Sequence, residues 1–241
     1  MSDIPQESLR PVMQPRLEAL LAAGVPVSAV LDVGVLSGTD FLLACFPAMP
    51  HVLFEPVEAH LPAIRQRYAA LRHVLVQVAL SDEDGQAWQI GTSVDGSGKV
   101  THSELSDVPV RVGERPEVVE CKPVRKARLD TVMAEISHTG PYLLKVDVDG
   151  QELQILSGAR ETLRTVSILI IEAPTGTIRA RTEFAESCQF RLIDIVDPCS
   201  YHGILSQVDL IFINEEWFAK CPDLSPWQSK SFAWSAWHRF D

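Results

Sequence analysis

Hydrophobic residues gather in short unbroken runs along the chain, and the segments between many of these runs carry apolar residues every three or four positions. Unalternating runs of valine, isoleucine and leucine predict strands that are covered on both faces, as in parallel sheets. The spacing of three and four predicts helices between them. Seven strands are expected, at residues 30–33, 51–54, 74–79, 142–148, 166–171, 191–196 and 208–214. The predicted fold class is therefore α/β, with a doubly wound, Rossmann-like and mostly parallel seven-stranded sheet.

Two segments interrupt the alternation of strand and helix. Residues 197–207 form a short loop without a helical pattern, so the last two expected strands should run antiparallel to each other. Residues 82–141 are polar and rich in glycine, serine and proline, with short β-like pieces at residues 87–90, 108–112 and 118–124. They are expected to form an insertion within a single domain that spans residues 1–241. Its exit from the carboxyl edge of the sheet favours a substrate-side cap, with a decorative hairpin or a dimerisation arm as the alternative.

The composition narrows the class of protein and its surroundings. Hydrophobic residues make up 46% of the 241 residues, which is enough to bury a full core. The formal net charge of −11 disfavours binding to nucleic acid or to an anionic membrane surface. The chain opens without a basic stretch followed by an apolar one, and its longest uncharged stretch near the start, residues 41–54, is too short to span a bilayer. The five cysteines form no CxxC pair. A cytoplasmic protein is therefore expected.

A loop with two glycines follows the first expected strand. Residues 32–38 read D-V-G-V-L-S-G, in which Gly34 permits a tight turn and Gly38 permits close approach of the backbone to a ligand or to a helix. A strand, a glycine turn and a helix in succession indicate a nucleotide-type binding loop. The loop is not the G-x-G-x-x-G of dinucleotide enzymes, because position 36 is Leu36, and it is not a P-loop, because no Gly-Lys-Ser/Thr follows. A pyrophosphate ligand is therefore disfavoured.

Residues at the ends of the next two expected strands complement this loop. Glu55, which ends the second strand, can accept hydrogen bonds from both hydroxyls of an adenosine ribose. The end of the third strand, residues 79–82, offers apolar atoms to flank an adenine ring, and Ser81 or Asp82 to bond its exocyclic amine. Asp32 adds negative charge where a ligand's ammonium group could sit. S-adenosylmethionine, with its adenine, its ribose and a positively charged amino acid end, matches all of these features.

The most specific segment of the chain surrounds the fourth expected strand. Residues 143–159 read L-L-K-V-D-V-D-G-Q-E-L-Q-I-L-S-G-A, which resembles the signature L-K-I-D-V-E-G-x-E-x-x-V-L-x-G-A of the FkbM-type S-adenosylmethionine-dependent methyltransferases. Five further blocks resemble that family's motifs in the same order. They are residues 32–38, through Asp32, Val33, Gly34 and Gly38, and residues 54–56, 79–81, 129–131 and 170–172. The resemblance covers about residues 28–215. Val35 and Leu36 depart from the family's Ala-Asn, and Asp149 departs from its usual Glu.

The resemblance implies a class I methyltransferase fold and methyl transfer from S-adenosylmethionine to a hydroxyl group of a sugar or a natural product. Together with the loop, it yields the candidate cofactor-binding residues, which are Asp32, Gly34, Ser37, Gly38, Glu55, Pro56, Ala79, Leu80, Ser81 and Lys145. The expected partner is a small-molecule or saccharide acceptor, with neither nucleic acid nor membrane. A homodimer is left open.

Carboxylates after the fourth expected strand are the candidate catalytic groups, because transfer to an alcohol requires removal of its proton. Asp147 and Asp149 would share one face if the strand continues through them. They could act as a base, or hold Mg²⁺ that polarises the hydroxyl, whereas the structural alternative is that Asp147 caps the following helix. Lys145 lies on the same face and could pair with a carboxylate. His102, in the insertion, could be a base or contact the substrate.

Two other classes of protein remain open from the sequence. A nicotinamide-dependent oxidoreductase would use a similar fold, although the third glycine of its fingerprint is missing here. A non-catalytic binding protein would keep the fold without turnover, as the replacement at Val35 and Leu36 suggests. The aromatic tail, residues 227–240, could pack on the core or on a dimer partner, or stack on an acceptor.

Overall fold

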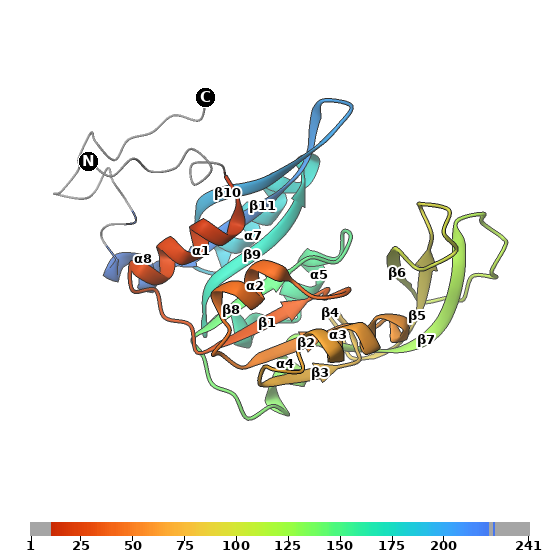
Figure 1. Ribbon diagram of the computed structural model, residues 1–241, viewed down its shortest axis with the longest axis horizontal. Helices are drawn as coiled ribbons and strands as arrows, with labels where there is room; N and C mark the ends of the chain where they lie inside the picture. Colours follow the sequence, from red (N-terminus) through yellow and green to blue (C-terminus); the bar gives the residue numbers. More distant parts are fainter. Residues whose placement is uncertain (1–10, 222–223, 225–241) are drawn as a thin grey trace.

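A mostly parallel sheet of seven strands runs through the molecule (Figure 1). The computed structural model describes residues 11–221 and residue 224. The strands are β1 (Ala29–Val33), β2 (His51–Phe54), β3 (His73–Val76), β8 (Tyr142–Val146), β9 (Val166–Pro174), β10 (Phe190–Tyr201) and β11 (Ile204–Asn214), in the spatial order β10-β11-β9-β8-β1-β2-β3. β11 runs antiparallel to both β9 and β10, and the other pairs of this sheet are parallel. The predicted fold class is confirmed, including the antiparallel last strand.

Helices cover both faces of this sheet, which explains why its strands are apolar without alternation. Within β1, Leu31 and Val33 point into one core and Val30 points into the other. The first core is closed by α4 (Leu129–Ala134), α5 (Glu152–Ser157), α6 (Arg160–Leu163) and α7 (Ile178–Ser187). The second is closed by α1 (Met13–Ala22), α2 (Asp40–Cys45) and α8 (Glu215–Lys220), with α3 (Leu61–Arg67) packed over β2. None of the helices in the described part of the chain is long and apolar enough to cross a membrane.

A second sheet of four strands follows β3 in the chain. Its strands are β4 (Ala79–Ser81), β5 (Gly85–Thr92), β6 (His102–Ser106) and β7 (Val118–Arg128), in the order β4-β7-β5-β6. In Figure 1 this sheet projects from the side of the main sheet that carries β3, away from β10 and β11. The helix α4 then leads back to β8 in the main sheet, so residues 129–134 of the expected insertion belong to the crossover.

Three local expectations are wrong in the connecting segments. The third strand ends at residue 76 and not at residue 79, because residues 79–81 leave the main sheet to pair with residues 126–128 of β7. Residues 108–112 are no strand: Val108 and Val112 are exposed, and Val112 forms an isolated bridge with Arg115. The expected loop at residues 197–207 is largely strand, because β10 and β11 continue as a hairpin. The aromatic tail, residues 227–240, lies outside the described residues.

A buried ion pair holds the start of α5 against α7. Glu152 is fully buried and accepts hydrogen bonds from the backbone N–H of Gly150, at 2.9 Å, and from the guanidinium of Arg181. Arg181 is only 2% exposed. Because Gly150 belongs to the turn that follows β8, this pair also fixes the shape of that turn.

Arg181→Met is expected to lower the free energy of unfolding by about 3–5 kcal/mol, because Glu152 then stays buried without its counter-charge. Arg179→Met is the matched control, since Arg179 lies on the same helix and pairs with Glu183 at the surface; such exposed pairs contribute little. Urea unfolding followed by circular dichroism measures both variants. Equal losses from the two substitutions would contradict a structural role for the buried pair.

Candidate active site

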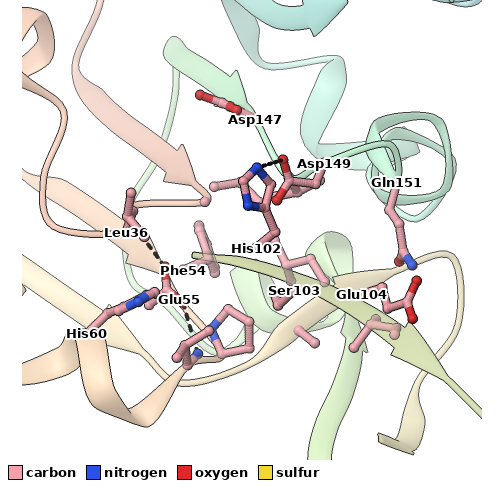
Figure 2. A pocket seen from close by; sticks show the side chains of 18 of the residues that line it. Leu36, Phe54, Glu55, His60, His102, Ser103, Glu104, Asp147, Asp149 and Gln151 are labelled. Carbon is pink, nitrogen blue, oxygen red and sulfur yellow. Dashed lines mark hydrogen bonds and ion pairs between the residues drawn. The ribbon is translucent and has the colours of Figure 1, made fainter. Parts of the chain in front are cut away.

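A cavity of about 370 Å³ opens where the carboxyl ends of the central strands meet the second sheet (Figure 2). Its wall comes from the loop after β1, the end of β2 with the short helix η2 (Glu58–His60), residues 78–80, residues 100–105, and the turn after β8. Parallel strands end at the same edge of a sheet, so the topology brings these distant segments together. The predicted site residues that line the cavity are Gly34, Glu55, Pro56, Ala79, Leu80, His102, Asp147 and Asp149.

The two glycines of the loop after β1 make room for neighbouring parts of the protein. Gly34 has φ +82°, and a Cβ there would overlap the backbone carbonyl of Asp147 at the end of the neighbouring strand. Gly38 has φ +123°, and a Cβ there would overlap the side chain of Arg67 on α3. Of the two alternatives for Gly38, the structure therefore shows close approach to a helix. Ser37 and Gly38 do not line the cavity.

Leu36 lies on the cavity wall in the left-handed region of backbone conformation, with φ +52°. The residue is 50% exposed, and its backbone N–H donates a hydrogen bond to Oε2 of Glu55 at 2.8 Å. Asparagine adopts this conformation readily, whereas leucine does so at a cost. The position at which the resembling signature carries Asn is therefore strained in this chain.

Glu55 presents a carboxylate to the cavity, and two backbone amides hold it in place. Oε2 accepts from the N–H of Leu36 at 2.8 Å, and Oε1 accepts from the N–H of Val57 at 2.9 Å. The residue is only 4% exposed. A carboxylate offers about four lone-pair positions, so about two remain for further donors. The hydroxyls of a ribose fit this carboxylate, as the sequence predicts.

The apolar part of the wall suits an adenine ring, but the polar contact expected beside it is absent. Val78, Ala79 and Leu80 line the cavity with buried side chains. Ser81 and Asp82 do not line it, and the Ser81 hydroxyl instead donates to Oδ1 of Asp82 at 3.1 Å. These two residues lie off the cavity wall because residues 79–81 pair with β7 instead of ending the third strand.

Asp32 and Lys145 lie beneath the loop and not on the cavity wall, which corrects both cofactor assignments. Asp32 is fully buried and accepts hydrogen bonds from the hydroxyls of Thr39, at 2.8 Å, and Tyr68, at 3.4 Å. The Nζ atom of Lys145 lies 3.5 Å from Oδ1 of Asp32 and 3.1 Å from Oδ2 of Asp147. Burial opposes the charged lysine, but the two carboxylates outweigh it and raise its pKa. Asp32 therefore supports the loop through Lys145.

The turn after β8 presents the two candidate catalytic carboxylates. β8 ends at residue 146 and Asp149 has φ +56°, so the expected alternation along a strand is not what places them. Both still line the cavity. Asp147 pairs with Lys145, whereas Oδ1 of Asp149 lies 4.0 Å from Nε2 of His102 (Figure 2). The residue at the cap of α5 is Gln151, so the structure does not support the alternative role of Asp147 as a cap.

Two further carboxylates surround Asp147. Glu172 lies within β9, opposite Asp209 of β11, and accepts a hydrogen bond from the side-chain amide of Gln207. Burial, followed by the charge of Asp147, raises the pKa of Glu172 to about 8 and that of Asp209 to about 7. Both carboxyls therefore keep their protons to a higher pH than an ordinary carboxyl does, which reduces the negative charge beside the cavity.

Sequence reasoning missed His60, Glu104 and Gln151, which also line the cavity. The alternation of β6 places Glu104 on the same face as His102, and that signal could have revealed it. No sequence pattern marks His60. Its position depends on the single turn of η2, which brings its Nδ1 atom to 3.4 Å from Oε1 of Glu55.

Mg²⁺ is the alternative use of Asp147 and Asp149. Across residues 11–221 and 224, no group of three His, Cys, Asp or Glu side chains is arranged to hold a metal ion. Asp147 faces the ammonium of Lys145, and Asp149 faces His102. These residues do not fit a magnesium site.

The structure is an α/β fold with a cavity at the carboxyl edge of its main sheet, the position at which open α/β sheets bind their ligands. The family model of the methyltransferase FkbM domain matches residues 32–192 of the chain. The chain belongs to this family, as the segment around β8 implies, and it is an S-adenosylmethionine-dependent methyltransferase.

Three solved structures are similar to this chain at low sequence identity. They are a ribosomal protein L11 methylase from Lactobacillus delbrueckii subsp. bulgaricus, an rRNA methylase from Streptococcus thermophilus and the fibrillarin pre-rRNA processing protein of Methanococcus jannaschii. The L11 methylase is 10% identical, with 84% of this chain and 78% of that chain covered and a TM-score of 0.44. The rRNA methylase is 12% identical, with 84% and 96% covered and a TM-score of 0.44. The fibrillarin protein is 12% identical, with 83% and 76% covered and a TM-score of 0.45. No curated protein matches the sequence. The family assignment rests on the domain match.

Leu36→Asn is expected to raise the free energy of unfolding by about 1 kcal/mol, because a left-handed leucine costs roughly 1–2 kcal/mol that asparagine largely avoids. Leu36→Ala is the control, since alanine keeps the unfavourable backbone preference. Urea unfolding of the three proteins decides the point. Strain at this position is refuted if the two variants have the same stability.

Glu55→Gln is expected to weaken binding of S-adenosylhomocysteine by about 1–3 kcal/mol, because the amide loses the charge and some of the acceptor positions for the ribose. Glu58→Gln is the matched control, since Glu58 lies close by in the chain, is 71% exposed in its side chain and pairs with Lys122. Isothermal titration calorimetry measures both. Unchanged affinity in Glu55→Gln would remove Glu55 from the ribose site.

Proposed function

We propose that this methyltransferase acts on a hydroxyl oxygen of a sugar or a natural product. The observation that carries the proposal is the pairing of His102 with Asp149 in the same cavity as Glu55. A histidine that a carboxylate holds in place is well suited to take a proton from an alcohol at neutral pH.

Different residues of the cavity would hold different parts of the cofactor. Glu55 would bind the ribose, Val78 and Leu80 would flank the adenine, and the backbone of Gly34 and Leu36 would lie along the amino acid end. When bound, S-adenosylmethionine supplies an electrophilic methyl group on a positively charged sulfur. The protein's part is to place the acceptor oxygen in line with that group and to remove its proton.

His102 is the proposed general base. The hydroxyl of Thr101 donates to the carbonyl of Thr92, so its oxygen, 3.1 Å from Nδ1, accepts from the Nδ1–H of the neutral imidazole and orients the ring. Nε2, which lies 4.0 Å from Oδ1 of Asp149, is left as the basic nitrogen. As the carbon–oxygen bond forms and the carbon–sulfur bond breaks, the acceptor's proton passes to Nε2 and Asp149 stabilises the imidazolium. Both side chains are about half exposed, at 48% and 47%, so they are free to close the 4.0 Å gap when an acceptor binds.

The charges on the cavity wall favour a neutral acceptor rich in hydroxyls. Four carboxylates line the cavity, and the described residues of its wall include no lysine or arginine; the four are Glu55, Glu104, Asp147 and Asp149. Carboxylates accept hydrogen bonds from hydroxyl groups and repel phosphates and other carboxylates. This supports a saccharide or another polyol over an anionic acceptor.

Residues 100–105 give the second sheet a direct part in the proposed function. They line the acceptor side of the cavity next to His102, which supports the view of this segment as a substrate-side cap. The five cysteines of the chain are free, which suits a cytoplasmic enzyme.

Incubation with labelled S-adenosylmethionine and a panel of neutral saccharides, polyketide-like alcohols, amines and sugar phosphates tests the proposal. We expect label on a hydroxyl oxygen of a neutral acceptor, located by mass spectrometry of fragments. Label on nitrogen or carbon would overturn the assignment to oxygen. Cofactor binding without product from any acceptor would favour the non-catalytic alternative.

His102→Gln and Asp149→Asn are each expected to lower turnover of an identified acceptor by about 10²–10⁴, because the proton acceptor or its partner is lost. Affinity for S-adenosylhomocysteine should change by less than about 1 kcal/mol, as neither residue belongs to the ribose end. His202→Gln, at the exposed β10–β11 turn, controls for the loss of a histidine. Normal turnover in His102→Gln would exclude His102 as the base.

A further inference from the structure

We infer that His60 is a cofactor-positioning residue that couples binding of the ribose at Glu55 to closure of residues 100–105 over the cavity. The inference rests on the proposed placement of S-adenosylmethionine in this cavity, and it adds a residue that the family signature does not contain. His60 lies at the end of η2, and its side chain is 16% exposed.

The imidazole of His60 lies between the cofactor side and the cap side of the cavity. Its Nδ1 atom is 3.4 Å from Oε1 of Glu55, and the ring also meets the backbone carbonyl of Val100. Val100 is tied to the second sheet, because its side chain packs against the backbone of Gly91 and the next residue, Thr101, bonds Thr92 at 2.8 Å. A movement of His60 is therefore expected to shift residues 100–105, which cover the acceptor side of the cavity.

The contact of His60 with Glu55 is incomplete without a ligand. The 3.4 Å separation is longer than a full charge-assisted hydrogen bond, and Nδ1 is buried without a hydrogen-bond partner among the described residues. Glu55 has used one position on each oxygen for the N–H groups of Leu36 and Val57. A ribose hydroxyl placed here would donate to the free position of Glu55, and a turn of the buried imidazole toward the cavity would let the same hydroxyl accept from Nδ1 of His60.

The surroundings of His60 favour its protonated form, which has two N–H donors. Glu55 at the end of β2 raises its pKa, burial opposes this, and the Val100 carbonyl and Glu120 on β7 raise the pKa further, so that the net direction is upward. Glu58, on the same short helix, faces Lys122. The cation can donate to the ribose and to Val100 together, whereas the neutral ring keeps only one donor. The coupling should therefore be present below the pKa of His60 and lost as the pH rises through it.

Binding of S-adenosylhomocysteine, measured by calorimetry between about pH 5.5 and 9 (from roughly one unit below an ordinary histidine pKa to roughly 2.5 units above it), tests the first half of the inference. The wild-type dissociation constant should rise about tenfold or more across this range. His60→Ala should bind about tenfold more weakly at the acid end, with a flatter pH profile. His60→Gln, which keeps one donor and cannot titrate, should recover part of the affinity without the pH dependence. His202→Ala, at an exposed turn, should match the wild type.

Amide hydrogen exchange of residues 100–105 tests the second half. S-adenosylhomocysteine should slow exchange there in the wild type and have little effect in His60→Ala, even at a ligand concentration that saturates the variant. Absence of binding to the wild type would overturn the proposed cofactor site and this inference with it. Binding to the wild type, with the same affinity, pH profile and protection in His60→Ala and His60→Gln, would overturn the role of His60 alone.

Discussion

The ammonium of Lys145 is the interaction on which the site depends. It lies beneath the loop after β1, within 3.5 Å of Asp32 and 3.1 Å of Asp147, and 3.4 Å from the carbonyl of Gly34. A buried cation of this kind is stable only while its counter-charges stay close. Lys145 thereby joins the ends of β1 and β8, the two central strands. It fixes the distance between the loop after β1 and the turn after β8.

The cavity is lined by residues from two sheets, and only a few segments of the chain connect these sheets. The main sheet provides Gly34, Glu55 and the carboxylates after β8, and the second sheet provides residues 100–105. The approach of His102 to Asp149, at 4.0 Å, and the contact of His60 with Val100 connect these layers across the cavity. Under the proposed function, the main sheet would hold the cofactor and the second sheet would face the acceptor, so that a shift between the two sheets could admit the substrate and then exclude water.

Much of the fold could be predicted, because strands covered on both faces carry unbroken apolar runs. The end of β3 could not, since residues 79–81 are as apolar as a continued strand and their departure depends on pairing with β7, which is distant in sequence. Within the site, local motifs located Gly34, Glu55 and Asp147 on the cavity wall. Asp32 was misplaced because a carboxylate on a strand has the same sequence pattern whether it faces a ligand or a buried lysine. His60 was missed because its place is set by tertiary contacts alone.

The position of β6 at the edge of the second sheet has a consequence for how the cavity wall can be changed. Gly34 and Phe54 serve the cavity and the core packing together, so a change in the cofactor half disturbs the fold as well. Along β6, by contrast, one side is bonded to β5 and, among the described residues, the other borders no further strand of its sheet. Under the proposed function, a substitution on this edge strand would therefore change the wall that faces the acceptor without touching the packing of the main sheet that shapes the cofactor end of the cavity.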